Sequence, residues 1–237
     1  IIWQKHFPDS FVIYKPKDIV AGDFYWLEIV NNVKLFAVAD CTGHGVPGAM
    51  VSVVCSNSLN RVVNEFNITE PGKILDKTKE LVVEHFTKGG EDVKDGMDIS
   101  LCSLCYENDK IFLKWAGANN PLYIVRWKEN LTGFKNLLDL EEIKPDKQPI
   151  GKTDNNVPFT TYKIELQKND CIYLFSDGFH DQFGGKSGKK FKASRMKELL
   201  LSIQNKTMSE QKKIITYIFD NWKDNLEQVD DVCVIVI

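Results

Sequence analysis

Four acidic turns, each at the edge of an apolar run, have the residue types and spacing to do chemistry. Asp23 and Asp40 lie in the glycine-bearing segments GDFY and ADCTGHG, and Asp177 lies in FSDG. The fourth turn is the pair Asp230 and Asp231, just before the last apolar run. Hard divalent cations bind several carboxylate oxygens at one point, and glycines let backbone carbonyls and water approach. The four turns form one metal centre if the fold brings them together.

The ligand types restrict the metal. One aspartate at a strand edge is equally well explained as an ordinary tight turn. Four of them favour a metal centre, because clustered carboxylates repel unless a cation compensates. Nitrogen and sulfur ligands are scarce, since the chain has four histidines and five of its six cysteines lie within apolar runs. The oxygen-rich set therefore predicts Mg²⁺ or Mn²⁺ rather than Zn²⁺.

The composition bounds the class of protein. Hydrophobic residues make up 43% of the 237 residues, which is ample for a core, and the net charge of -3 argues against nucleic-acid binding. No apolar run approaches the roughly 20 residues that span a bilayer. The cysteine usage fits a reducing, cytoplasmic compartment. Because the chain begins at Ile1 rather than Met, we expect a fragment, with residues 1–15 as the end of an upstream linker and the first strand and residues 16–237 as a single domain.

Hydrophobic periodicity and turn signals predict strands in hairpin-like runs and helices in pairs. The expected strands are 11–14, 24–30, 34–39, 98–106, 110–116, 122–127, 159–166, 171–175 and 232–237. The expected helices are 49–66, 69–86, 193–204 and 209–228, the last after a capping box at 207–210. We expect 128–158 to be irregular and 87–96 to be mobile. This order is not the strand-helix alternation of a parallel sheet, so it predicts antiparallel sheets covered by helix pairs.

In this order the acidic turns resemble the signature motifs of the metal-dependent protein phosphatases (PPM, type 2C-like). They are most similar to those of the SpoIIE/RsbU-type bacterial serine phosphatases. The matching segments are GDFY, ADCTGHGVPGA, FSDG and DDV, and the segments GMDIS at 96–100 and AGANNP at 116–121 also resemble that branch. Each motif alone is weak evidence, but the ordered set is highly specific and runs from about Pro16 to the C-terminal residue.

The resemblance implies an α+β fold, a four-layer α-β-β-α sandwich with two mostly antiparallel sheets and a two-metal site at one end. By motif matching, Asp40 would bridge two Mn²⁺ or Mg²⁺ ions and the backbone carbonyl of Cys41 would bind one of them. Asp177 and Asp230 would complete the protein ligands. Asp23 would act mostly through metal-bound water.

The resemblance assigns other residues less directly. Asp95 or Asp98 would touch a third, weaker ion, and the sequence does not choose between them. Asp231 falls where wider-family relatives often have asparagine. His44 is a candidate acid for the leaving alkoxide, although a turn histidine is the simpler interpretation.

Wider-family relatives often use an arginine near the first motif to hold phosphate. The cations near that motif in this chain are Lys15 and Lys17. Both are therefore candidate substrate-binding residues, although neither has the planar fork of an arginine.

The predicted activity is phosphoserine/phosphothreonine protein phosphatase, hydrolysing phosphate by a metal-activated water as the output domain of a bacterial signalling protein. The resemblance implies a phosphorylated protein substrate such as an anti-sigma-factor antagonist, an upstream sensor domain and, as one option, a homodimer. Two alternatives are a non-catalytic phosphoprotein-binding module of the same fold and a hydrolase of small phosphate esters. The intact aspartates argue against the first, and the basic run after Asp177 weakly disfavours the second.

Overall fold

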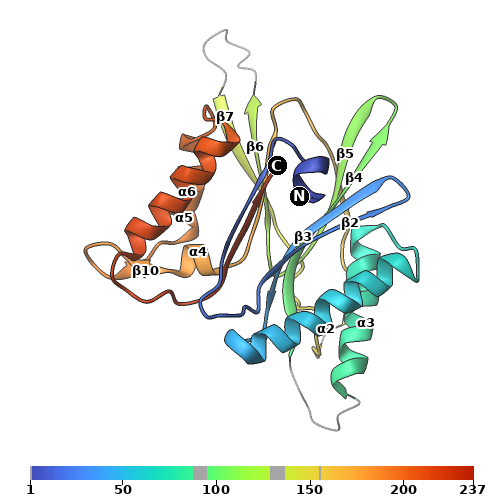
Figure 1. The fold of residues 1–237 in the computed structure, drawn as a ribbon. Coiled ribbons are helices and arrows are strands. Elements are labelled where there is room, and N and C mark those ends of the chain that lie inside the picture. The colour runs from blue at the N-terminus through green and yellow to red at the C-terminus, as the bar shows by residue number, and fades with distance from the viewer. Residues whose placement is uncertain (1, 88–94, 129–136, 155) are drawn as a thin grey trace.

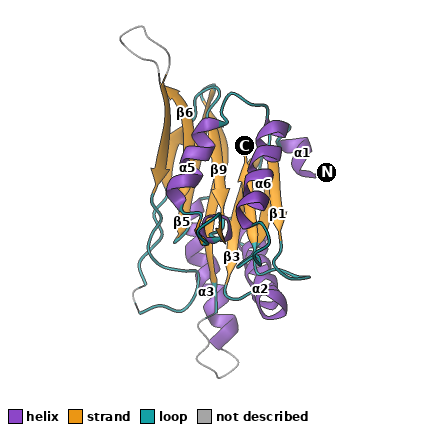
Figure 2. Cartoon of the chain, turned by 90° about the vertical axis from the view of Figure 1, so that its left-hand side faces the viewer, coloured by secondary structure: helices purple, strands orange, loops and turns teal. Residues whose placement is uncertain are grey.

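The computed structural model describes residues 2–87, 95–128, 137–154 and 156–237. Two five-stranded sheets stack face to face, and a pair of helices covers each outer face (Figures 1 and 2). All strand pairs within the two sheets are antiparallel. The expected four-layer α-β-β-α sandwich is therefore confirmed.

The first sheet has the order β1 (Phe11–Lys15), β12 (Val232–Val236), β9 (Cys171–Phe175), β6 (Leu122–Lys128), β7 (Leu137–Ile143). The second has the order β2 (Phe24–Val30), β3 (Val33–Cys41), β4 (Met97–Glu107), β5 (Lys110–Ala118), β8 (Tyr162–Glu165). The helices are α1 (Ile2–His6), α2 (Gly45–Asn64), α3 (Pro71–Thr87), α4 (Gly178–Asp181), α5 (Ala193–Ser202) and α6 (Met208–Lys223). A small hairpin pairs β10 (Phe183–Gly184) with β11 (Lys189–Lys190).

Strands β9 and β12 are apolar and buried along their whole length because both of their faces are covered. In β9, Ile172 and Leu174 pack between the two sheets. Tyr173 and Phe175, which alternate with them, pack under α5 and α6. Successive side chains of a strand point to opposite faces, so a continuous apolar run is what a doubly covered strand requires. Each fully buried side chain of this kind contributes about 1.5–3 kcal/mol to the stability of the fold.

The helix pairs are held by apolar stripes at helical spacing. In α2, Cys55, Leu59 and Val62 are fully buried against the second sheet. In α6, Ile215 and Phe219 are buried over the first sheet. The expected capping box starts α6, since Thr207 Oγ1 accepts a hydrogen bond from the backbone of Glu210, whose side chain accepts one from the backbone N–H of Thr207.

Several elements differ from the sequence-based expectation. Strand β7 lies inside the stretch that the sequence predicted to be irregular. It was missed because an edge strand with charged residues among its apolar ones has no continuous apolar run. Helix α2 begins at Gly45, earlier than expected, since Pro47 is tolerated in a first turn where no backbone N–H has a helical partner. The sequence did not predict α1, α4 or the β10–β11 hairpin. The expectation of mobility for 87–96 falls mostly outside the described residues.

The first residues are joined closely to the rest of the fold. Strand β1 pairs with β12 along its length. Trp3 and Phe7 are buried between the sheets, and Trp3 Nε1 donates a 2.8 Å hydrogen bond to Ser10 Oγ. The domain boundary after residue 15 stays a prediction. None of the described helices has both the length and the hydropathy to cross a membrane.

Candidate metal centre

The antiparallel pairing brings the acidic turns to one end of the sandwich. Asp23 lies just before β2 and Asp40 near the end of β3, and these two strands are neighbours in register. Asp177 follows β9 and Asp230 precedes β12, which are neighbours in the other sheet. Because β12 also contacts β2 and β3 across the sheet interface, both acidic pairs lie at the same end. The fold thus gathers residues that are far apart in sequence.

The carboxyl groups are close enough to perturb one another. The pKa of Asp40 is raised to about 9, first by burial and then by the charges of the neighbouring aspartates, Asp23, Asp177 and Asp230. The pKa of Asp23, which is 3% exposed, is raised to about 7 by burial and by the same kind of repulsion. Burial likewise raises the pKa of Asp177. A cation at this place would remove the repulsion that raises these pKa values.

Neighbouring donors offset part of these shifts. The backbone of Asp177 lowers the pKa of Asp40, and the side chain of Ser176 lowers the pKa of Asp23, against the larger effect of burial. Asp23 Oδ2 is buried and has no hydrogen-bond partner among the described residues. An orphaned buried carboxylate oxygen is costly unless a cation or a water molecule completes it.

Glycines allow the backbones around the centre to touch. A Cβ on Gly22 would lie 2.4 Å from the carbonyl oxygen of Gly43 and 3.1 Å from that of Cys41. A Cβ on Gly178 would lie 2.0 Å from the carbonyl oxygen of Asp231. These distances leave no room for a side chain, so the glycines in the GDFY and FSDG segments serve close packing of the turns, whereas Gly43 and Gly45 in ADCTGHG have positive φ angles of 84° and 63°. The Cys41 carbonyl, a candidate ligand, lies in this packed region.

Asp98 and Asp95, the two candidates for a third metal ion, differ in how the structure connects them to the acidic cluster of Asp23, Asp40 and Asp177. Asp98 lies opposite Asp40 in the β3–β4 register. Its pKa is raised by burial and by the charge of Asp177, against a 2.8 Å hydrogen bond from Asn119 Nδ2. Asp95 lies in the turn before β4, where its backbone packs on Gly151. The structure therefore links Asp98 to the acidic cluster electrostatically.

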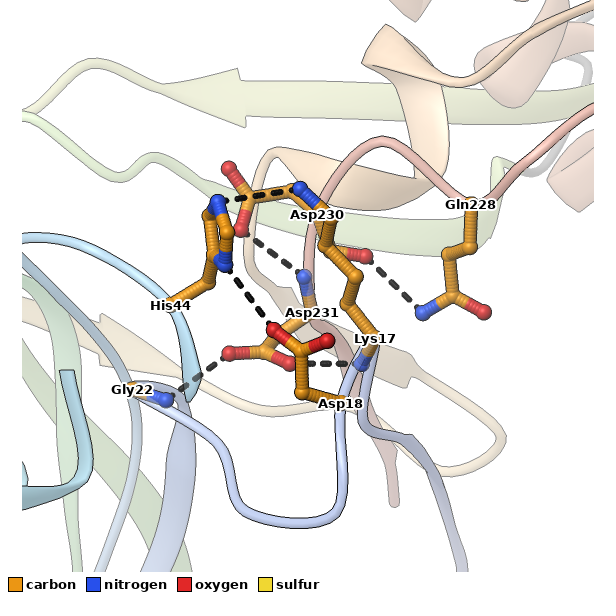
Figure 3. A network of polar contacts seen from close by, with 7 residues as sticks. All are labelled: Lys17, Asp18, Gly22, His44, Gln228, Asp230 and Asp231. Carbon is orange, nitrogen blue, oxygen red and sulfur yellow. Dashed lines mark hydrogen bonds and ion pairs between the residues drawn. The ribbon is translucent and has the colours of Figure 1, made fainter. Parts of the chain in front are cut away.

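Asp231 uses both carboxylate oxygens to hold the loop that precedes Asp23. Oδ1 accepts a 2.7 Å hydrogen bond from the backbone N–H of Lys17, and Oδ2 accepts a 2.8 Å one from that of Gly22 (Figure 3). The side chain is 2% exposed. With both oxygens committed to the backbone, Asp231 organises the loop, a role that the sequence alone left open.

The candidate substrate-binding residues Lys15 and Lys17 and the candidate acid His44 have different polar partners. Lys15 Nζ forms a 2.6 Å ion pair with Asp220 of α6. Lys17 Nζ lies 3.0 Å from His44 Nε2, and His44 Nδ1 lies 2.9 Å from Asp18 Oδ2 (Figure 3). Asp18 was missed in the sequence, because nothing in the local pattern shows that it meets a histidine 26 positions away.

The donor set fits a hard divalent cation. It consists of carboxylate and carbonyl oxygens, which suit Mg²⁺ and Mn²⁺. Within the described ranges, no group of three or more His, Cys, Asp or Glu side chains lies close enough together to hold a metal ion. The argument that these residues suit a divalent cation therefore rests on three features: the oxygen donors, the repulsion between the carboxylates, and the Asp23 oxygen that has no hydrogen-bond partner.

The stacked antiparallel sheets have the fold of PP2C-like domains in solved structures. The family model for Stage II sporulation protein E (SpoIIE) matches residues 32–237, and the chain belongs to this family. A comparison with curated protein sequences gives no match.

Solved structures share this fold at low sequence identity. The SiaA-PP2C domain of Pseudomonas aeruginosa has a TM-score of 0.84 and 24% identity, over 100% of this chain and 88% of that one. The PP2C phosphatase domain of SpoIIE from Bacillus subtilis, with a fragment of its regulatory domain, has a TM-score of 0.69 and 17% identity, over 96% and 62%. RsbX in complex with magnesium has a TM-score of 0.61 and 13% identity, over 96% and 92%.

Proposed function

We propose that this domain is a metal-dependent phosphoserine/phosphothreonine protein phosphatase. One observation carries the proposal: at one end of a PP2C-like fold, buried aspartates raise one another's pKa, and one of them has an orphaned oxygen. Buried carboxylates that repel one another are typical of sites that bind a cation, because the cation compensates the repulsion. Membership of the SpoIIE family supports the same reaction class.

The roles that we propose for the acidic residues are those that the motif resemblance implies. Asp40, Asp177, Asp230 and the Cys41 carbonyl would hold two Mg²⁺ or Mn²⁺ ions, and Asp23 would reach them through water. A pair of bound divalent ions supplies phosphate charge neutralisation and activation of a water nucleophile. The chain's own contribution is to fix the carboxylates, since β3 and β9 deliver Asp40 and Asp177 from buried strands. Asp98, rather than Asp95, is the candidate for a third, weaker ion.

The biological setting is part of the proposal. The substrate would be a phosphoprotein, such as an anti-sigma-factor antagonist, and an upstream sensor domain would control the phosphatase. The solved SpoIIE structure that carries a fragment of a regulatory domain supports this arrangement. The six cysteines, which form no disulfide, are consistent with a cytoplasmic protein.

The direct test is hydrolysis of an aryl phosphate and of a phosphoserine peptide with added metal. We expect Mn²⁺ or Mg²⁺ to stimulate both reactions and a chelator to abolish them, because the centre offers oxygen ligands to hard cations. Restoring the metal in excess over the chelator should restore the rate, which controls for denaturation. Undiminished hydrolysis in excess chelator would contradict the metal mechanism. Metal-dependent hydrolysis of the aryl ester alone would favour a hydrolase of small phosphate esters.

A further inference from the structure

Positive charge is concentrated in one short segment after Asp177. Between residues 182 and 197 the chain has six lysines and arginines and no aspartate or glutamate, although the whole chain has a net charge of -3. The segment covers the β10–β11 hairpin and the start of α5. A run of like charges is either a solvated surface or a contact for a partner of opposite charge. The cations of this segment are Lys186, Lys189, Lys190, Lys192, Arg195 and Lys197.

Four of these six cations have no partner of opposite charge. Lys190 forms a 2.6 Å ion pair with Asp181, and Lys197 forms a 2.8 Å ion pair with Glu142. The other four are exposed and make no ion pair with any residue that the structure describes. Because like charges on one short segment repel, these four gain from an anionic partner. We call them the basic face: Lys186, Lys189, Lys192 and Arg195.

The fold ties the hairpin to the end of the sandwich that carries the acidic residues. Asp181, the partner of Lys190, donates a 3.0 Å hydrogen bond from its backbone N–H to the carbonyl oxygen of Asp177. The side chain of Gln182 accepts a 3.1 Å hydrogen bond from the backbone N–H of the residue before Asp230. Figure 1 shows β10 next to α4, on the outer side of the first sheet. The hairpin is therefore anchored beside two of the proposed metal ligands.

Lys192 occupies a strained backbone position within the basic face. Its φ of 73° and ψ of 147° lie in a region that favours glycine. Its backbone N–H donates a 2.7 Å hydrogen bond to the carbonyl oxygen of His180, which holds it there. A side chain at such a position costs stability, because its Cβ crowds the backbone. A glycine would suit the backbone of this position better than the lysine does.

We propose that the basic face docks an acidic segment of the phosphoprotein substrate, beside the metal centre and apart from the phosphate itself. This docking rests on the proposed phosphatase function, and the favoured substrates are phosphoproteins with acidic residues near the phosphoserine. Opposite charge draws such a segment to the basic face, and each ion pair that it forms lowers the KM.

A short acidic segment suits the basic face better than an extended anionic surface does. Because six cations lie in one segment, the rest of the chain is more acidic than the net charge of -3 indicates. Charges at a protein surface interact over about 10 Å at ordinary salt concentrations. A short segment therefore meets the basic face alone, whereas a membrane or a nucleic acid also meets the acidic remainder.

The first experiment measures binding to the metal-free protein, so that no turnover is needed. Two phosphoserine peptides are compared, identical except for a run of glutamates or a run of glutamines beside the phosphoserine. NMR of the backbone amides follows the titrations. We expect the glutamate peptide to bind about threefold to thirtyfold more tightly, the combined size of three exposed ion pairs, and to shift the amide signals of the hairpin.

A matched pair of variants locates the effect. Both replace three exposed lysines that make no ion pair with a described residue, so their net charges are equal. The hairpin variant should lose the preference for glutamate, and the control, at the start of α6, should keep it. Equal affinity of the wild type for the two peptides would overturn the proposal, as would a preference that survives in the hairpin variant or disappears in the control. The hairpin variant is Lys186→Gln, Lys189→Gln, Lys192→Gln, and the control is Lys206→Gln, Lys212→Gln, Lys213→Gln.

Lys192→Gly separates charge from folding. Glycine relieves the backbone strain, so we expect a melting temperature equal to or above that of the wild type. One cation is lost, so the preference for the glutamate peptide should fall by about twofold to fivefold. A folded Lys192→Gly protein with the full preference would contradict the role of Lys192.

Sedimentation with phosphatidylserine vesicles tests the membrane alternative. We expect the wild type and the hairpin variant to sediment equally with the vesicles. Vesicle binding that depends on the hairpin lysines, without discrimination between the two peptides, would identify a membrane contact and overturn the proposal.

Hydrolysis in the presence of Mn²⁺ separates docking from the phosphatase function. The wild type should prefer the glutamate peptide through a lower KM at similar kcat. The hairpin variant should differ from the wild type far more on this peptide than on an aryl phosphate, which is too small to reach the basic face. Equal kcat/KM for the two peptides would overturn the docking and leave the phosphatase proposal standing. A wild type inactive on every ester would refute the phosphatase proposal, and the NMR titration would still decide whether the basic face binds acidic segments.

Discussion

Replacing Asp40 or Asp177 by asparagine is expected to lower turnover by roughly a thousandfold or more, the scale of losing a main charge-stabilising group. Both carboxylates stand at the ends of buried strands, and both have a raised pKa within the shared acidic cluster. An asparagine keeps the shape but provides only one neutral oxygen for a cation. Steady-state hydrolysis of an aryl phosphate at saturating Mn²⁺ measures the effect.

The chain offers a matched control for these variants. Asp109 lies in the exposed turn between β4 and β5 and has a positive φ of 61°, a conformation that asparagine also adopts readily. Asp109→Asn should therefore leave both turnover and folding unchanged. Circular dichroism and thermal melting establish that Asp40→Asn and Asp177→Asn remain folded. A folded Asp40→Asn or Asp177→Asn protein with a near-normal rate would count against the assigned metal centre.

The metal centre could be proposed from the sequence because each proposed ligand position is marked locally, and it stays a prediction. An aspartate at the end of an apolar run, with a glycine close by, is visible without a structure, as in Asp40 and Asp177. The antiparallel layers followed from the order of strands and helix pairs, which periodicity also shows. Strand β7 was missed, since an edge strand that carries several charges lacks the apolar run by which the central strands were found.

The rest of the site depends on contacts between distant segments. Asp231 holds the backbone of Gly22 across 209 positions, and no local pattern records such a contact. Lys15 and Lys17 are equivalent as cations in the sequence. Only the structure distinguishes them, because Lys15 forms an ion pair with Asp220 on α6 and Lys17 lies beyond the end of β1. Loop packing, which sets these partners, follows from three-dimensional closeness rather than from periodicity.

The metal-free protein is expected to lose stability as the pH rises from about 4 to 9, because its folded acidic cluster holds protons that the unfolded chain has released. The pKa of Asp40 is raised from the ordinary value of 3.8 to about 9, and that of Asp23 to about 7. Between the unfolded and folded pKa values, the folded state binds more protons, so the free energy of unfolding falls with rising pH. A pKa that differs by one between the folded and unfolded states corresponds to about 1.4 kcal/mol, so the loss is on the order of several kcal/mol.

Urea unfolding of the metal-free protein across this pH range measures the loss, and Asp40→Asn isolates its main source. The variant lacks the titrating carboxyl, so its stability should fall less steeply with pH than that of the wild type. Its metal-free stability at pH 9 should equal or exceed the wild-type value, because one repelling charge is gone. Adding Mg²⁺ at about a hundredfold excess over its Kd should stabilise the wild type by about 3 kcal/mol. If the free energy of unfolding of the two metal-free proteins changed with pH in the same way, Asp40 would not be repelled by its neighbours in the folded state. The physical argument for a cation at this site would then fail.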